Sequence, residues 1–124
     1  MLGAMSDSMT YCSDVNRVYL RGKLAADAVP RTLPSGDELC LFRLNVERAE
    51  GERVRVDSLD CATAKARVRQ TVSRAQPGDE LEVSGSLRRR FWRGAGRLSR
   101  RYEVSVVAAR IISRQRPARR RSDA

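Results

Sequence analysis

Apolar and polar side chains alternate strictly along the chain from Val15 onward. Val18, Leu20 and Leu24 fall on one face together with Gly22, and the positions between them carry arginine, tyrosine or lysine. Alternation with a period of two predicts a β-strand that buries one face. The same alternation returns in four later segments, at residues 39–48, 53–63, 80–92 and 100–112. The sequence therefore predicts five strands.

Prolines and glycines mark the connections between these strands. Residues 25–38 contain two prolines and a glycine and are expected to form a loop, whereas AEGE at 49–52 and GAG at 94–96 predict tight turns. In the third strand the apolar positions change parity near Asp57 and Ser58. This change predicts a β-bulge or a sharp bend, of the kind by which a strand turns the corner of a small barrel.

One segment between the third and fourth strands has helical spacing instead. Its apolar residues recur every three or four positions, at Ala64, Val68, Val72 and Ala75. This spacing predicts an amphipathic helix of about three turns over residues 63–75, which Pro77 and Gly78 end. Five strands with one helix between the third and fourth is the order of the all-β OB fold, a partly open Greek-key barrel. Other small barrels also have five strands.

The two ends of the chain lack such patterns. Residues 1–14 are small and polar without a period and are expected to form a flexible leader. Residues 113–124 have too little apolar content to bury and are expected to form a disordered basic tail. A chain of 124 residues suits one domain, so we expect a single folded unit over residues 15–112.

The chain carries a net charge of +10, and this charge is unevenly distributed. Residues 1–86 hold 12 basic and 13 acidic side chains, whereas residues 87–124 hold 13 arginines and 2 acidic side chains, which leaves −1 and +11. Of the 25 basic residues, 23 are arginine, whose planar guanidinium suits phosphates and stacks on bases. A merely solvated surface would mix the signs more evenly. The asymmetry favours a polyanionic partner, nucleic acid above all.

Other classes of function have little support in the composition. Three distant cysteines, Cys12, Cys40 and Cys61, and no histidine argue against a disulfide framework, a zinc site or an activated cysteine nucleophile. Free thiols are expected, two of them in the core. We expect no enzyme activity, no cofactor and no small-molecule substrate, because no paired-carboxylate site or phosphate-binding glycine loop can be assembled. Without a run of about 20 apolar residues or a signal pattern, the protein is expected to be cytoplasmic, nucleoid-associated and free of membrane contact.

Two long segments match a known family without gaps. They are NRVYLRGKLAADAVPRTLPSGDELCLFRLNV (16–46) and VDSLDCATAKARVRQTVSRAQPGDELEVSGSLRRRFW (56–92). The matching positions are Asn16, Val18, Gly22, Leu24, Asp27, Arg31, Pro34, Gly36, Phe42, Leu44, Gly78, Gly85, Leu87, Arg88, Arg90, Trp92 and Tyr102. In their joint spacing these residues resemble bacterial single-stranded DNA-binding proteins, over residues 15–112. The resemblance implies the OB fold, with single-stranded DNA as the partner.

The sequence also departs from that family's pattern. Ser58 and Ala64 stand where the family would carry aromatic rings that stack on bases, and the short turn at 49–52 lacks another such position. The family's long flexible tail with an acidic tip is replaced by a short arginine-rich end, so partner recruitment through such a tip is not implied. Trp92 and the arginines at 88 and 90 are retained.

The fourth strand carries the candidate site. Its alternation predicts an inward face formed by Leu81, Val83, Gly85 and Leu87. The outward face then presents Ser84, Ser86, Arg88, Arg90 and Trp92. We expect Trp92 to stack on a base while guanidinium groups hold phosphates. The predicted DNA-binding residues are Arg88, Arg90, Trp92, Arg93, Arg97, Arg100, Arg43 and Arg31, with no catalytic and no metal-binding residue.

Several of these side chains admit other roles. Trp92 could close the barrel or take part in a subunit contact. Phe42 and Phe91 are expected in the core, and Tyr19 faces outward where the resembled family makes subunit contacts. Three arginines could pair with acids on neighbouring strands, namely Arg17, Arg21 and Arg43.

We therefore predict a single-stranded DNA-binding protein without sequence preference, active in replication, recombination or repair. It is expected to form a homo-oligomer, with a tetramer favoured and a dimer possible. Two alternatives remain open. One is an OB-fold replication accessory of the primosomal type that binds DNA mainly by charge, and the other is an OB subunit that binds protein.

Overall fold

Six strands and one helix make up the part of the chain that the structure describes. The computed structural model describes residues 11–94 and 97–115, with the side chains of residues 91–100 outside this description. The elements are β1 (Val18–Leu24), β2 (Val29–Thr32), β3 (Glu38–Glu50), β4 (Arg53–Thr63), α2 (Ala66–Arg74), β5 (Glu80–Gly94) and β6 (Arg97–Ser113). Among these residues, no helix is long and apolar enough to cross a membrane.

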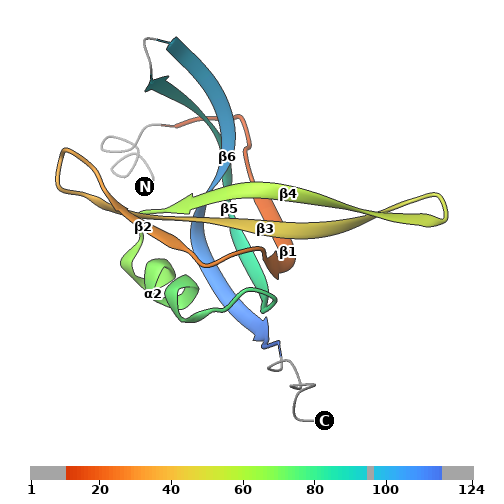
Figure 1. Ribbon diagram of the computed structural model, residues 1–124. Coiled ribbons are helices and arrows are strands. Elements are labelled where there is room, and N and C mark those ends of the chain that lie inside the picture. Colours follow the sequence, from red (N-terminus) through yellow and green to blue (C-terminus); the bar gives the residue numbers. More distant parts are fainter. Residues whose placement is uncertain (1–10, 95–96, 116–124) are drawn as a thin grey trace, which may run out of the picture.

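The strands form a closed barrel with the predicted element order. They pair in the order β1-β5-β6-β4-β3-β2, and a further pairing of β1 with β3 closes the ring (Figure 1). All pairings are antiparallel except that of β4 with β6, where Cys61 and Ala62 lie beside Val104 and Ser105. The helix lies between β4 and β5 in sequence, as predicted. The OB barrel expected from the alternation is confirmed.

A short strand, β2, lies inside the segment that the sequence predicted as a loop. It pairs antiparallel with β3, from Val29 opposite Leu41 to Thr32 opposite Glu38. Pro30 argued against a strand in this segment. However, β2 is an edge strand that pairs with β3, and an edge strand tolerates a proline. The prediction of an unstructured loop over 25–38 was therefore wrong in this part.

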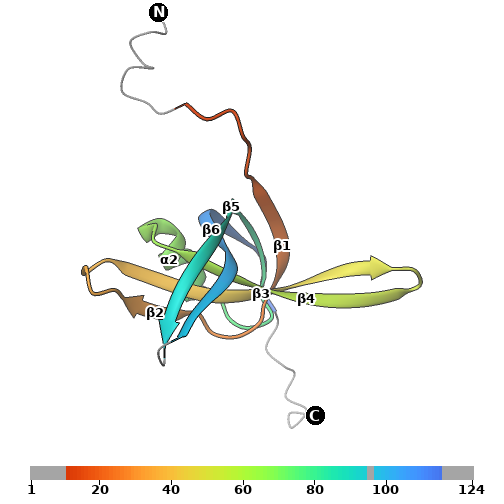
Figure 2. The same ribbon diagram turned by 90° about the horizontal axis from the view of Figure 1, so that it is seen from above.

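The β-bulge predicted near Asp57 is absent, because β3 and β4 pair without a shift from Cys40–Thr63 to Glu50–Arg53. The hairpin projects beyond the barrel as a two-stranded ribbon, which both views show (Figures 1 and 2). Val54 and Val56 lie on this ribbon and are 65% and 55% exposed. They are apolar but not inward, so the change of parity marks the point where β4 leaves the barrel.

The register shifts that do occur lie between β5 and β6. Ser84 pairs with Ala108 but the next residue, Gly85, pairs with Val106, so β6 has one extra residue there. Beyond this bulge Leu87 is 46% exposed, so the prediction that it points inward was wrong. A bulge bends its strand and increases the local twist. In this case the end of the β5–β6 hairpin stands away from the barrel (Figure 1).

Aliphatic side chains fill the barrel, and the helix covers one end of it. The largest fully buried side chains include Leu24, Leu44 and Leu81, and Phe42 is buried with them as predicted. Val68 and Val72 of α2 join this core. The helix is shorter than predicted. Its start is delayed because Thr63 still belongs to β4 and its hydroxyl accepts a hydrogen bond from the Lys65 backbone N–H.

The end of β6 is held to the barrel through Asp79. This carboxylate is only 1% exposed and accepts backbone hydrogen bonds from Gln76 (2.8 Å) and Gln115 (2.7 Å), and Arg114 lies 3.7 Å away. The two backbone bonds, that from Gln76 first, lower the pKa of Asp79. Residues 114 and 115 fall within the predicted tail, but these contacts attach them to the domain. The remaining tail arginines lie outside the described residues.

Candidate nucleic-acid interface

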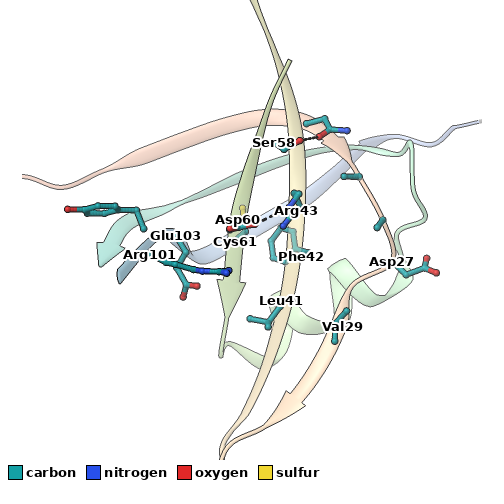
Figure 3. Close-up of a pocket in the computed structure, with 14 residues that line it drawn as sticks. Asp27, Val29, Leu41, Phe42, Arg43, Ser58, Asp60, Cys61, Arg101 and Glu103 are labelled. Carbon is teal, nitrogen blue, oxygen red and sulfur yellow. Dashed lines mark hydrogen bonds and ion pairs between the residues drawn. The ribbon is translucent and has the colours of Figure 1, made fainter. Parts of the chain in front are cut away.

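A groove opens on the outer face of β3 and β4. Its cavity has a volume of about 460 Å³, within the range of roughly 300–1,000 Å³ that ligand sites commonly have. One wall is the chain between β1 and β2, at Ala25–Val29, and the other is the Arg101–Glu103 segment of β6 (Figure 3). The OB fold binds oligonucleotides on this face, between the loop that follows its first strand and the loop that joins its last two strands. The fold thus places a cavity where its ligand surface lies.

Two hydrogen-bonded pairs form the floor of the groove. The Arg43 Nε–H donates to Asp60 (3.0 Å), and the Ser58 hydroxyl donates to Asn45 Oδ1 (2.6 Å). Each pair joins residues directly opposite each other on β3 and β4, where side chains of the same face meet. The Arg43–Asp60 pair confirms that this arginine contacts an acid of its own chain. One oxygen of Asp60 and the terminal nitrogens of Arg43 have no hydrogen bond within the described part of the chain.

An acidic side chain also lies in the β6 wall. Glu103 is 8% exposed, and its carboxylate lies 2.7 Å from Nε of Arg90 on β5. Arg88 stands directly opposite Glu103 in the ladder, and Arg90 stands opposite Arg101. Glu103 therefore lies among three arginines, of which Arg90 is in contact with it. A buried carboxylate of this kind fixes the guanidinium and weakens its attraction for another anion.

One residue that lines the groove and carries an exposed aromatic ring was absent from the predicted site. Tyr102 lines the cavity and is 61% exposed. A ring of this kind can stack on a base. The sequence contained this signal, since Tyr102 is one of the positions that match the resembled family.

The predicted site residues are only partly brought together. Arg43 lies on the groove floor, and Arg90 contacts its wall through Glu103. Arg31 on β2 and Arg88 on β5 are exposed but do not line the cavity. The remaining predicted residues have side chains outside the described part, namely Trp92, Arg93, Arg97 and Arg100, as does Phe91. Their backbones continue the β5–β6 hairpin, with Trp92 opposite Ser99 and Gly94 opposite Arg97.

The model of the single-strand binding protein family matches residues 15–113. The chain belongs to this family. A solved structure described as a Plasmodium falciparum SSB complex with ssDNA has the same fold, with a TM-score of 0.69 and 17% sequence identity, over 86% of this chain and 100% of that one. No curated protein matches the chain significantly.

In this single-strand binding family member the groove is lined by both apolar and polar side chains and is not strongly basic. Ser58, which the sequence analysis placed where the family would carry a ring, lies on the groove floor bonded to Asn45. The sequence analysis did not identify Asn45 and Asp60 as groove residues, because their position in the groove depends on the β3–β4 register. The alternation along β3 shows that Arg43 and Asn45 share a face. It does not show which residues of β4 lie opposite them.

The two buried cysteines are not reactive nucleophiles. Cys40 and Cys61 are buried and free, and Cys12 is exposed and free, as expected. Burial raises the pKa of Cys61 to about 12 and also raises the pKa of Cys40. Both thiols are therefore protonated at neutral pH and are weak nucleophiles. Within the described ranges, no group of three or more metal-ligating side chains occurs.

A second surface lies on the outer side of β1, β5 and β6. The Tyr19 hydroxyl donates to Glu82, and Arg110 Nη2 donates to the same carboxylate at 2.7 Å. These bonds, that from Tyr19 first, lower the pKa of Glu82, and the bond to Glu82 raises the pKa of Tyr19. Exposed Val107 lies next to Tyr19 around a shallow pocket. Tyr19 faces outward as predicted, on a surface that combines apolar area with an organised polar network.

Proposed function

We propose that this protein binds single-stranded DNA in the groove over β3 and β4 and along the β5–β6 hairpin. The observation that carries the proposal is the position of the groove, which is open at the OB ligand face and has the arginine-rich β5–β6 hairpin as its neighbour. Residues 87–124 supply a charge of +11, from 13 arginines and 2 acidic side chains. Membership of the single-strand binding family supports the same partner.

The binding mechanism combines a small amount of stacking with a large electrostatic contribution. Tyr102 offers an exposed ring at the edge of the groove, and Trp92 is a second candidate for stacking on a base. Stacking is worth about 1–3 kcal/mol per base and tolerates any base, whereas phosphate contacts depend steeply on salt. The exposed arginines that support phosphate binding are Arg31, Arg88 and Arg101, with further arginines at 93, 97 and 100.

We further propose that the protein works as a homo-oligomer, most simply a tetramer, that docks through the Tyr19 surface. Exposed Tyr19 and Val107 would bury apolar area there, and the Tyr19–Glu82–Arg110 network would set the orientation of the two copies. Mass measurement in solution tests this proposal. A monomer at micromolar concentration would contradict the proposed homo-oligomer. A dimer would show that the copies associate through one interface and would rule out the tetramer.

The groove favours binding over catalysis, since the chain has no histidine and the buried thiols are protonated. The cellular setting implied by this function is replication, recombination or repair at the nucleoid.

A second candidate function is that of a replication accessory of the primosomal type. The polar floor favours it, because Ser58 and Asn45 offer no ring where stacking would otherwise occur.

The decisive experiment compares labelled oligo-dT, duplex DNA and RNA of equal length in fluorescence-anisotropy titrations at several salt concentrations. We expect the single DNA strand to bind tightest, with a log–log salt slope of about −0.7 per phosphate contacted. Equal affinity for duplex and single strands would refute the proposal. A flat salt dependence would refute the arginine mechanism while leaving the partner intact.

A further inference from the structure

The β5–β6 hairpin is attached to the barrel at one level of the sheet. The pairing of β1 with β5 ends at Val18 opposite Gly85, and beyond this point β5 pairs with β6 alone among the described strands. On the β6 side, Val104 pairs with Cys61 of β4 and lies opposite Leu87 of β5. Further toward its tip the hairpin is a two-stranded ribbon that stands away from the barrel (Figure 1). The direction of the ribbon is therefore set where Leu87 and Val104 lie side by side.

The two strands are anchored differently at this level. Val104 and Cys61 are both buried, so the β6 side is packed into the core. Leu87 is exposed, and its anchor is the side chain of Asn16. The Asn16 Nδ2 donates to the Leu87 carbonyl (2.8 Å), and the Leu87 N–H donates to Asn16 Oδ1 (2.9 Å). One side-chain amide thus satisfies both backbone groups of Leu87, as the backbone of a neighbouring strand would.

Asn16 stands at the place where the β1–β5 ladder would continue. Since Val18 lies opposite Gly85, an antiparallel ladder would place residue 16 opposite Leu87. However, β1 begins at Val18, and at residue 16 the side chain makes the two hydrogen bonds instead of the backbone. Bonds at an exposed position add little to the stability of the whole domain, because water competes for the same groups. Their effect falls on the ribbon, because two strands alone are only marginally stable.

We propose that Asn16 is a positioning residue for DNA binding, which holds the hairpin at the angle at which one DNA strand can contact the groove and the hairpin together. This inference rests on the proposed function. From Leu87 to Gly94 the ribbon is about 23 Å long, so a rotation of about 10° at its base moves the tip by roughly 4 Å. A displacement of this size is enough to break a hydrogen bond or an ion pair.

The groove and the hairpin meet at this base. Arg101 and Tyr102 line the groove from β6, and exposed Arg88 follows Leu87 on β5. When two regions of one protein bind the same strand, the second contact forms at an effective concentration that depends on their relative placement. A ribbon held at a fixed angle keeps this effective concentration high, and a ribbon that swings lowers it. Loss of the Asn16 bonds should therefore weaken only those ligands that reach both regions.

The test compares Asn16→Leu with the unmodified protein on oligo-dT of two lengths. Leucine has a similar size and no charge, but its side chain can make neither hydrogen bond to Leu87. An oligonucleotide of about 4 nucleotides can contact the groove or the hairpin, whereas one of about 16 can reach both, and these lengths span the site sizes of OB folds. In fluorescence-anisotropy titrations we expect Asn16→Leu to bind the long oligonucleotide about tenfold more weakly, and the short one with less than about a twofold change.

Ser113→Ala is the matched control at the other end of the same two strands. It removes the side-chain hydrogen bond from Ser113 to Glu80 (3.5 Å) and should leave the ratio of the two affinities unchanged. Thermal melting and mass measurement check that each variant is folded and keeps its oligomeric state. A further measurement needs no variant. Amide hydrogen exchange at Leu87 in the unmodified protein should be slow, because this N–H is bonded to Asn16.

The outcomes separate this inference from the function on which it rests. An unchanged ratio in Asn16→Leu, or an equal loss of affinity for both lengths, overturns the positioning role. An equal change of the ratio in Ser113→Ala overturns it too, as does a Leu87 amide that exchanges as fast as an unbonded one. Tight binding of both lengths without a gain from length overturns the simultaneous contact and leaves single-strand binding intact. If neither oligonucleotide binds the unmodified protein, the proposed function itself fails.

Discussion

The carboxylate of Glu103 restrains an arginine that would otherwise be available to DNA. Glu103 is almost fully buried in the groove wall and lies 2.7 Å from Nε of Arg90. Replacing it by glutamine removes the negative charge but keeps the size of the side chain and an oxygen that can accept a hydrogen bond. Arg90, whose side chain is 37% exposed, would then be available to a phosphate.

The expected change in DNA affinity follows from counterion release. One additional phosphate contact steepens the log–log salt slope by about 0.7, so near 0.1 M salt the affinity for oligo-dT should rise by about fivefold relative to a 1 M reference. Fluorescence-anisotropy titration of labelled oligo-dT at four or more salt concentrations measures both quantities. Thermal melting of Glu103→Gln accompanies the titration to establish that the variant is folded.

A matched control uses another acid–arginine pair, neither residue of which lines the groove. Glu38 pairs with Arg69 of α2 at 2.9 Å, so Glu38→Gln also frees one arginine and removes one negative charge. It should change the salt slope much less, because Arg69 does not line the groove. If Glu103→Gln leaves the slope unchanged, or if both variants steepen it equally, then Arg90 is not in reach of the bound strand and the reasoning is refuted.

Three further predictions concern the groove and the C-terminal end. Tyr102→Ala should weaken binding of oligo-dT by about 1–3 kcal/mol if its ring stacks, whereas Tyr11→Ala, which removes a ring outside the groove, should not; equal losses would refute the assignment. Deleting residues 116–124 should weaken binding and flatten the salt slope while the melting temperature stays the same, and a lower melting temperature would show that the tail belongs to the fold. Asp79→Asn should lower the melting temperature by several degrees near neutral pH. Because the folded pKa of Asp79 is depressed, its contribution is present above the unfolded pKa and is lost as the pH falls through the folded pKa, so the two proteins should converge in acid, and a constant difference would contradict this.

Much of the fold could be predicted because the buried faces have a regular period. The alternation from Val18 to Leu24 and the helical spacing of Val68 and Val72 both report burial directly. The errors arose where a residue's local character differs from its role in the barrel. Pro30 lies in an edge strand, where a missing N–H costs little. Val54 is apolar on a ribbon that projects into solvent.

The candidate site was harder to predict, since it depends on which residues lie opposite each other. Outward parity identified Arg43, but only the β3–β4 register shows that Asp60 faces it and neutralises it. Likewise the arginine at 90 was expected to be free for phosphate, but β6 brings Glu103 to it. The sequence of one strand shows which charged residues it carries. The acids that pair with its arginines lie on other strands, so the sequence of that strand alone does not show them.

The most direct test of the account asks where on the protein a single strand lies. Oligonucleotides that carry a photoreactive base can be cross-linked to the intact protein, and the modified peptides can be identified by mass spectrometry. The account predicts cross-links at Tyr102 and elsewhere in the groove between β3, β4 and the β5–β6 hairpin, with little modification of the Tyr19 surface or of α2. Cross-links confined to the Tyr19 surface or to α2, with the groove unmodified, would contradict it.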